Sequence, residues 1–244
     1  NLKNITNLFY KMFTDSQLTE IRNYLLSKKL PIDILIEVND HFISQISDLQ
    51  REENLGFEEA FEKTKENWKE ELKTTVPFYV IANKDKRAIT NFEKKIRKIE
   101  NYNVLKTSLA ISFIQLSLFF ILSNFYDVKN LRTYFFIFSI FPVLTIVYNY
   151  IFNSFAYKEK FKEIRFSVYH WRIFLIFSLG YFGLQYIKPF DEVISNLYQN
   201  KLDIETITKL IVFIILVIGF NYTGVAQFKF AKTMKKVKPF LKYL

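Results

Sequence analysis

Long apolar stretches separate charged loops over the second part of the chain. Four windows are each apolar over the length that a helix needs to cross a hydrocarbon layer, about 20 residues. Because helices of soluble proteins are rarely apolar on every side, four such windows predict a transmembrane domain over residues 105–228. The windows are residues 105–125, 133–155, 167–187 and 206–228.

The first 76 residues show a different pattern, in which apolar positions recur at spacings of three and four. Thr14 and Gln17 predict a capping box that opens a helix ending near Ser27, and Pro31 suits the first turn of the next helix. We expect Gly56 to end that second helix. Because no run alternates with period two, the region predicts a small all-α bundle. The apolar stripes of its second and third helices are Leu35, Val38, Phe42, Ile46 and Leu49, then Phe57, Ala60, Phe61, Thr64, Trp68 and Leu72.

Basic residues determine the orientation that we predict for the spans. Residues 1–76 carry 10 Lys and Arg against 14 Asp and Glu, so the net charge of +10 comes from the rest of the chain. There the basic residues concentrate before the first window, between the second and third, and after the fourth. Loops rich in Lys and Arg stay on the cytoplasmic side of a membrane. Both termini are therefore expected in the cytoplasm.

The complete prediction is an all-α chain in four parts. A cytoplasmic helical module occupies residues 1–76, and a basic juxtamembrane helix occupies residues 77–104. Within that second part, residues 88–103 are expected to run directly into the first span as one long helix. The four transmembrane helices follow, and residues 229–244 form a basic cytoplasmic tail.

The run from residue 30 to residue 68, LPIDILIEVNDHFISQISDLQREENLGFEEAFEKTKENW, contains Asp40 and His41, then Gly56, Phe57 and Ala60. This pattern resembles the N-terminal helical prefix of a loose group of uncharacterised Bacteroidota inner-membrane proteins. The resemblance implies a cytoplasmic helical module fused to a few transmembrane helices of the bacterial inner membrane. It also implies a regulatory or accessory role, and it carries no specific activity.

Four polar residues of the module form a candidate site for a partner or a pH response. Glu37 and His41 lie one helical turn apart, Gln45 continues the same line, and Asp40 lies beside them. A histidine changes its charge near neutral pH, which is the chemistry that a pH response needs. The alternative, which we favour, is a solvent-edge ion pair or a histidine packed on the neighbouring helix. We expect no metal site, because the second of only two histidines, His170, lies beyond the first two spans.

Polar and small residues within the windows are interpreted as helix-packing positions. Neutral polar groups inside a span seek a partner on another helix, and small residues let two helix backbones approach closely. A proline frees a backbone carbonyl and can kink a helix. The packing candidates are Gln115, Pro142, Gly180, Gly183, Gly219, Asn221 and Thr223.

The basic flanks of the spans are interpreted as contacts with anionic lipid headgroups. Each Lys or Arg near an anionic bilayer contributes about 1 kcal/mol of attraction. The candidates are Lys94, Lys95, Arg97, Lys98, Lys235, Lys236 and Lys238. We expect no nucleic-acid partner, because the chain lacks a recognition fold for one.

The sequence contains no phosphate loop, nucleophile elbow or dinucleotide fingerprint, and it has no cysteine. We therefore predict no catalytic residue, no cofactor and no metal. The leading hypothesis is a non-enzymatic regulatory, docking or accessory subunit whose helical module binds a protein partner. The alternative is a small transporter or channel subunit, formed when the four spans assemble as a homo-oligomer. An intramembrane enzyme using His170 and Arg172 is the least favoured, because no acid or nucleophile accompanies them in the spans.

Overall fold

The computed structural model divides the chain into two compact units. Unit 1 comprises Asn1–Ile99, Phe161–Val168 and Lys235–Leu244, and unit 2 comprises Glu100–Lys160 and Tyr169–Met234. Unit 1 thus takes in more of the chain than the predicted module at residues 1–76. The residues that the structure describes are 12–76, 88–125, 128–155, 164–165, 167–169, 195–196, 199 and 203–239.

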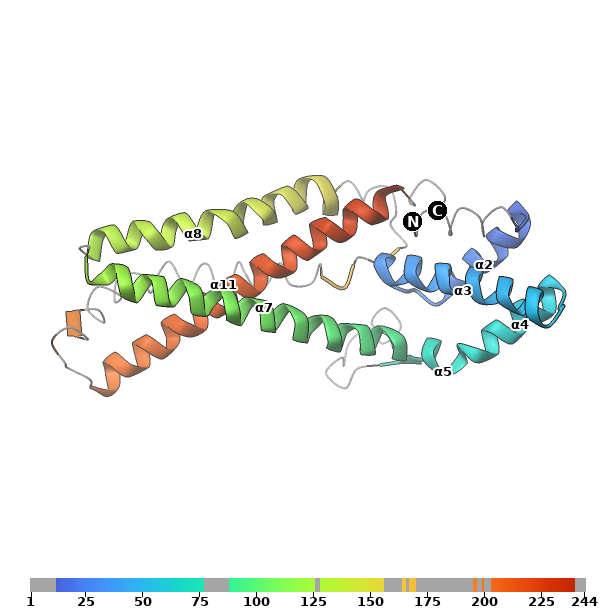
Figure 1. Cartoon of the computed structure of the whole chain (residues 1–244), viewed down its shortest axis with the longest axis horizontal. Helices are drawn as coiled ribbons and strands as arrows, with labels where there is room; N and C mark the ends of the chain where they lie inside the picture. The colour runs from blue at the N-terminus through green and yellow to red at the C-terminus, as the bar shows by residue number, and fades with distance from the viewer. Residues whose placement is uncertain are drawn as a thin grey trace. The chain divides into compact units, whose positions relative to one another are not determined.

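Unit 1 is mostly helical, as the sequence predicts (Figure 1). Its first helix begins with the predicted capping box, in which Gln17 N donates to Thr14 Oγ1 at 3.3 Å and Thr14 N donates to Gln17 Oε1 at 2.9 Å. This reciprocal pair satisfies two backbone donors that the start of a helix leaves free. The helices are α2 (Asp15–Ser27), α3 (Ile32–Glu52), α4 (Phe57–Asn67), α5 (Lys69–Leu72) and the first part of α7 (Asn91–Ser123).

The core of unit 1 forms where α2, α3 and α4 meet. Tyr24 of α2 lies within ring contact of Phe42 on α3 and Phe61 on α4, at centroid distances of 5.8 and 5.9 Å. The predicted stripes point into this core, except that Leu49 and Trp68 stay half-buried. The fully or nearly fully buried apolar side chains of α2 to α4 include Ile21, Leu25, Ile32, Ile34, Leu35, Val38, Phe42, Ile43, Ile46, Ala60 and Phe61.

Two details of unit 1 differ from the prediction. Gly56 does not end α3, which stops at Glu52; it is the residue that precedes α4, with φ −66°. The chain reverses at Asn54 instead, at φ 54°, and asparagine tolerates this left-handed conformation better than most residues. The second difference is a short antiparallel ladder between β1 (Thr74–Thr75) and β2 (Ile89–Thr90), which the all-α prediction for this region did not include.

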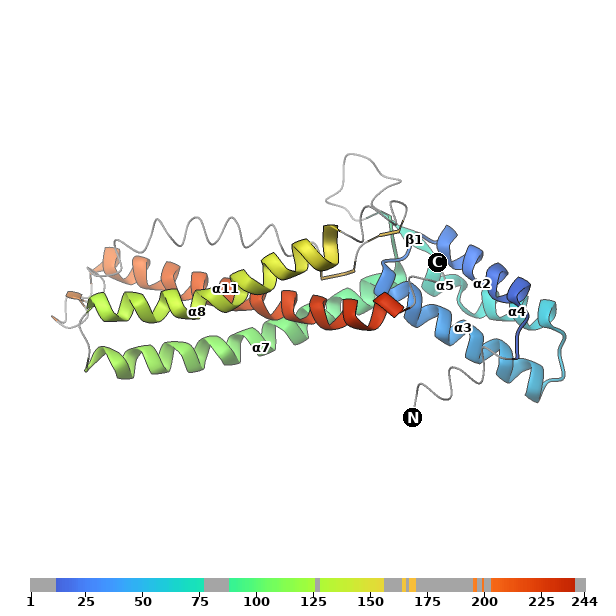
Figure 2. The ribbon, with the colours of Figure 1, turned by 90° about the horizontal axis from the view of Figure 1, so that it is seen from above.

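The described part of unit 2 contains three long helical segments (Figures 1 and 2). The rest of α7 is followed by α8 (Val128–Tyr148), which continues as a π-helix (Asn149–Phe155), and later by α11 (Ile204–Val237). Both Figure 1 and Figure 2 show α7 antiparallel to α8 and α11. The helix predicted from residue 88 begins instead at Asn91, directly after β2, and α7 then runs without a break through residue 123. The predicted tail is partly helical, because α11 runs past residue 228 to Val237.

Two described helices, α7 and α11, are long and apolar enough to cross a membrane. The second predicted window coincides with α8 and the π-helix, of which Ile140–Ser154 forms a shorter apolar stretch. Most of the third window lies outside the described residues. At its start, Val168 and Tyr169 form a turn and not a helix. A domain of four spans therefore stays a prediction.

The reassignment of Gly56 is testable with two substitutions in the α3–α4 connection. Gly56→Ser should raise the free energy of unfolding by about 0.3–1 kcal/mol, because serine caps a helix well and narrows the unfolded ensemble. Asn54→Val should lower it by about 1–2 kcal/mol, because a β-branched residue is strained at φ 54°. Trp68 fluorescence during denaturation, in a Trp171→Phe background, measures both. A strong loss on Gly56→Ser would contradict the assignment.

Candidate functional site

Helix α7 turns polar side chains inward and apolar side chains outward in unit 2. From residue 104 to residue 119 its buried residues are Val104, Ser108, Ser112, Gln115 and Phe119, of which three are polar. Phe113, beside Ser112, is 74% exposed. A helix of a soluble protein shows the opposite arrangement. A hydrocarbon environment favours this one, because polar groups must find partners inside while apolar groups face lipid at no cost.

The same outward display of apolar side chains continues on the other two helices. In water, so large an apolar surface would favour aggregation or association. The large apolar residues of α8, the π-helix and α11 that are more than half exposed are Ile137, Phe141, Leu144, Tyr150, Ile151, Phe152, Ile204, Ile211, Ile215 and Phe228.

The first layer of buried polar contacts joins all three helices. Asn221 Nδ2 on α11 donates to Ser112 Oγ at 2.9 Å and to Gln115 Oε1 at 2.8 Å, both on α7. The hydroxyl of Tyr134 on α8 donates to the backbone oxygen of Gln115 at 3.2 Å. The sequence analysis expected Gln115 and Asn221 to seek partners across helices, and here they bond to each other.

A second layer joins the π-helix to α11. Asn153 Nδ2 donates to Asn149 Oδ1 at 2.7 Å, and Asn149 Nδ2 donates to Gln227, at 3.0 Å to Oε1 and 2.7 Å to the backbone oxygen. Donation thus runs in one direction from Asn153 to Gln227. At the end of this chain, Gln227 Nε2 is buried and has no hydrogen-bond partner within the described part of the molecule, and the same holds for Ser154 Oγ. We call Ser112, Gln115, Asn149, Asn153, Asn221 and Gln227 the polar seam.

A close backbone approach of α8 and α11 accompanies the seam. A Cβ atom on Gly224 would lie 3.0 Å from Cγ of Pro142, so the proline ring packs directly on the glycine. Pro142 was a predicted packing position, but Gly224 was not. Thr223 and Gly219 are linked within α11, where Thr223 Oγ1 donates to the Gly219 backbone oxygen at 2.9 Å. Gly180 and Gly183 lie outside the described residues.

An ion pair links α7 and α11 beyond the seam. Lys229 Nζ lies 2.7 Å from Glu100 Oε2, and the hydroxyl of Tyr169 donates to the same carboxylate oxygen. Both charged side chains are half-buried. The pair sits before the first apolar window on α7 and after the fourth on α11, where polar headgroups or water can solvate it.

Unit 1 contains a buried carboxylate that two arginines share. Glu93 in the first turn of α7 is fully buried, and its Oε1 accepts from Arg97 Nε at 2.8 Å and from Arg165 Nη2 at 2.9 Å. Its Oε2 accepts from Arg165 Nη1, also at 2.9 Å. Arg165 Nη1 further donates to the backbone oxygens of Lys29 at 3.1 Å and Ala88 at 3.3 Å. A two-pronged contact of this kind is among the strongest ion pairs in proteins.

The residues around Arg165 are attached to the start of α3. We call Ile164, Arg165, Ser167 and Val168 the strap. Ile32 N donates to the Arg165 backbone oxygen at 3.0 Å, which forms a parallel bridge beside Pro31. Asp33 Oδ2 accepts from Ser167 Oγ at 2.7 Å and from Val168 N at 3.3 Å. The other oxygen, Asp33 Oδ1, is buried and makes no hydrogen bond among the described residues.

Burial sets the protonation behaviour of Asp33. It raises the pKa of this carboxyl above the ordinary value of 3.8, and the hydrogen bonds from Ser167 and Val168 offset only part of the effect. The ionised form of Asp33 is therefore less favourable in the folded protein than in the unfolded chain. The sequence analysis missed both carboxylates of this network. A lone acid, Glu93, directly before the basic run from Lys94 to Lys98 was the signal that could have found one of them.

In the predicted cluster of Glu37, Asp40, His41 and Gln45, two side chains contact Trp68. Gln45 Oε1 accepts from Trp68 Nε1 at 2.8 Å, and the His41 ring lies 6.0 Å from the Trp68 ring. Glu37 and His41 are exposed, and Asp40 is half-buried. Gln45 and His41 thus hold the tryptophan on the surface of α3. No group of three potential metal-ligating His, Cys, Asp or Glu residues occurs among the described residues.

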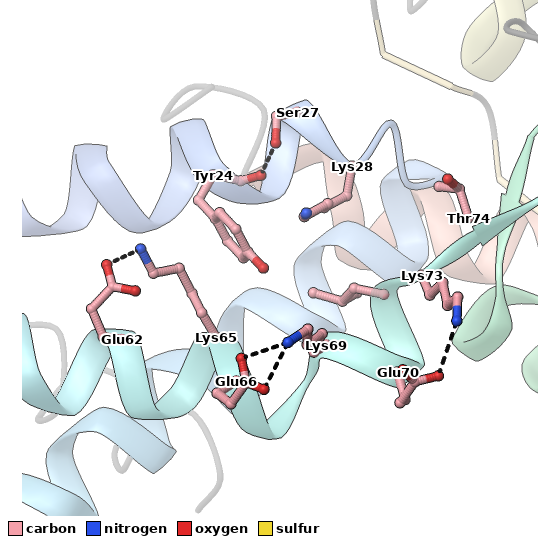
Figure 3. A pocket seen from close by; sticks show the side chains of 11 residues that line it. Tyr24, Ser27, Lys28, Glu62, Lys65, Glu66, Lys69, Glu70, Lys73 and Thr74 are labelled. Carbon is pink, nitrogen blue, oxygen red and sulfur yellow. Dashed lines mark hydrogen bonds and ion pairs between the residues drawn. The ribbon is translucent and has the colours of Figure 1, made fainter.

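A surface groove of about 650 Å³ runs between α2 and the α4–α5 segment (Figure 3). Its charged walls are largely self-neutralised, because Lys65 pairs with Glu62, Lys69 with Glu66 at 2.9 Å and Lys73 with Glu70 at 3.7 Å. Lys28 lies over the Tyr24 ring, 4.7 Å from its centroid. With alternating charges along one wall, the groove favours neither an anion nor a cation.

Two of the seven predicted lipid contacts are engaged in ion pairs within unit 1. Lys95 pairs with Glu71, and Arg97 pairs with Glu93. The remaining candidates are exposed: Lys94, Lys98, Lys235, Lys236 and Lys238. His170 and Arg172, the residues of the least favoured hypothesis, lie outside the described part of the chain.

Comparison with known proteins adds no functional assignment: no protein-family model, no curated protein and no solved structure matches the chain. The function has to be argued from the polar seam, the apolar surface around it and the charged contacts of unit 1.

The seam can be tested by Asn221→Leu, which removes the donor shared by Ser112 and Gln115. The variant should lower the free energy of unfolding by about 1–2 kcal/mol, because Gln115 Oε1 is left buried. Thr223→Val, two residues away, removes a bond only within α11 and should cost less than about 0.5 kcal/mol. Reversible unfolding in mixed detergent micelles measures both. Equal losses would contradict a special role for the seam.

Asp33→Asn tests the cost of the buried carboxylate. A folded-state pKa raised above the unfolded value means that Asp33 supports stability at pH below 3.8 and loses that contribution as the pH rises through the folded-state pKa. At pH 7 the asparagine variant should therefore be as stable as the parent or more stable. Its advantage should shrink as the pH falls toward 3.8. A loss of stability at pH 7 that disappears in acid would show that the hydrogen bonds to Asp33 outweigh its burial.

Proposed function

We propose that this chain is a multi-pass protein of the bacterial inner membrane, in which unit 2 crosses the bilayer and unit 1 works on the cytoplasmic side as a non-enzymatic regulatory or docking module. The observation that carries the membrane assignment is the inverted burial of α7, α8 and α11. Polar seam residues lie inside unit 2 while Phe113, Leu144 and Ile215 are exposed. Water would penalise this arrangement, and lipid would not.

The orientation rests on the placement of basic residues. Lys and Arg cluster beside the start of α7, in the stretch after the π-helix and at the end of α11. With α7, α8 and α11 as three spans and residues 167–187 as the fourth, all three clusters fall on one side, which is the cytoplasmic side by the positive-inside rule.

A protein partner suits residues 1–76 of unit 1 better than the bilayer surface does. Residues 1–76 carry 14 acidic and 10 basic residues, and an anionic leaflet repels a negatively charged surface. The apolar faces of α2, α3 and α4 are already used in the core of unit 1. A partner would therefore meet its polar outer surface, including the exposed carboxylates of Glu58 and Glu59 on α4.

Copurification of the full-length tagged chain in mild detergent tests the docking role. We expect a defined partner protein whose recovery falls at least threefold in a Glu58→Gln, Glu59→Gln variant, because complementary charge speeds and orients association. The matched control is Lys235→Gln, Lys236→Gln, which changes the same number of exposed charges at the end of α11. Recovery of no protein above an untagged control, or equal recovery from both variants, would contradict docking through α4.

A small transporter or channel subunit is the second candidate, and the free donor at Gln227 favours it. A buried amide without a partner, next to a π-helix and near a helix-embedded proline, resembles sites where membrane helices meet polar solutes. Purified protein in liposomes would then carry a flux that Gln227→Met reduces. No flux above empty vesicles would leave docking as the function that fits.

A further inference from the structure

The strap occupies an unusual place in the chain. Phe161–Val168 belongs to unit 1, although the residues before it, up to Lys160, and after it, from Tyr169, belong to unit 2. The strap thus includes the end of the connection between the second and third apolar windows and the first two residues of the third window. Because the chain on both sides of the strap belongs to unit 2, attachment or release of the strap affects the segments that precede and follow it.

The strap is attached mainly by polar contacts. Arg165 contacts Glu93 and two backbone oxygens, and Ser167 contacts Asp33. Among the described strap residues, Val168 is the one buried apolar side chain. Polar contacts can be exchanged for contacts with water or with another protein at far lower cost than a buried apolar cluster.

When the strap is released, neither Glu93 nor Asp33 is left buried without a favourable contact. Glu93 retains Arg97, whose Nε lies 2.8 Å from Oε1, so the buried charge does not lose its last cation. Asp33 gains water for Oδ1, the oxygen that is buried without a hydrogen bond in the attached state. The favourable Arg165 contact is therefore opposed by the burial of Asp33, which brings the attached and released states closer in free energy.

We propose that the strap is a releasable latch: Arg165 on Glu93 and Ser167 on Asp33 hold the connection between two apolar windows onto unit 1, and opening these contacts frees it without unfolding the unit. With the proposed function, in which unit 1 is cytoplasmic and unit 2 crosses the bilayer, opening of the latch would couple the module to the membrane helices. The start of α7, which carries Glu93, runs as one unbroken helix into unit 2.

The chain has no cysteine, so a single introduced thiol reports release of the strap directly. Val168→Cys places a thiol at a buried position of the strap and keeps the Ser167 contact with Asp33. Ser47→Cys places one in the core of unit 1, on α3, and reports unfolding of the unit. Ser16→Cys is an exposed control that measures the intrinsic reaction rate. The measurement is the rate of maleimide labelling of the full-length protein in detergent or nanodiscs.

Adding Arg165→Gln to each background is expected to speed labelling at position 168 at least tenfold and to leave positions 47 and 16 unchanged. Arg165→Lys, which keeps the charge but loses the forked contact, should give an intermediate rate. Asp33→Asn should slow labelling at position 168, because it removes the burial cost that opposes attachment. Faster labelling at positions 168 and 47 alike would show that the contact is part of the permanent core. No change at position 168 would show that Arg165 does not hold the strap; either result overturns the latch.

Discussion

Hydrogen bonds between neutral side chains in the interior of unit 2 are the interaction on which its architecture depends. Asn221 reaches two residues of α7, and Asn149 reaches both the backbone and the side chain of Gln227. In a helix that is apolar on nearly every side, no hydrophobic stripe selects the inward face, because lipid solvates leucine as well as another helix does. The polar groups select it, since they are the ones that lose free energy when they face hydrocarbon. Packing of Pro142 on Gly224 then fixes how closely α8 and α11 approach.

In unit 1, apolar side chains form the core, and a buried charged residue, Glu93, accompanies them. Its core is a conventional apolar cluster between α2, α3 and α4, but its connection to residues 164–168 relies on Glu93, Arg97 and Arg165. A buried carboxylate with two cations tolerates the loss of one of them better than an isolated pair would. Because Arg97 stays paired with Glu93, the contact between Arg165 and Glu93 can open without leaving a buried charge unpaired. The two units thus place their specific polar contacts at the positions where segments distant in sequence must find one another.

Local features were predictable because neighbouring residues encode them. The capping box at Thr14, the apolar stripe of α3 and the uninterrupted run of α7 each follow from spacing within one helix. Pairs such as Asn149 with Gln227, or Glu93 with Arg165, lie more than 70 positions apart and depend on how helices rotate and meet. One signal was available and not used: Ser108, Ser112 and Gln115 recur at spacings of four and three, which marks the polar face of α7. Gly56 was misassigned because glycine is common at both ends of helices, and Asn54 supplied the left-handed turn.

The central claim is that the outer surface of unit 2 faces lipid, and spin-label accessibility in a bilayer tests it most directly. Nitroxide labels would be attached at Phe113→Cys and, further toward the start of the same helix, at Lys94→Cys, in the full-length chain reconstituted into phospholipid vesicles. Both positions are exposed on α7. The account predicts that the label at position 113 collides with lipid-soluble oxygen far more than with a water-soluble nickel complex, and that the label at position 94 shows the reverse. A label at position 113 that reacts chiefly with the nickel complex would place α7 in water and contradict the account.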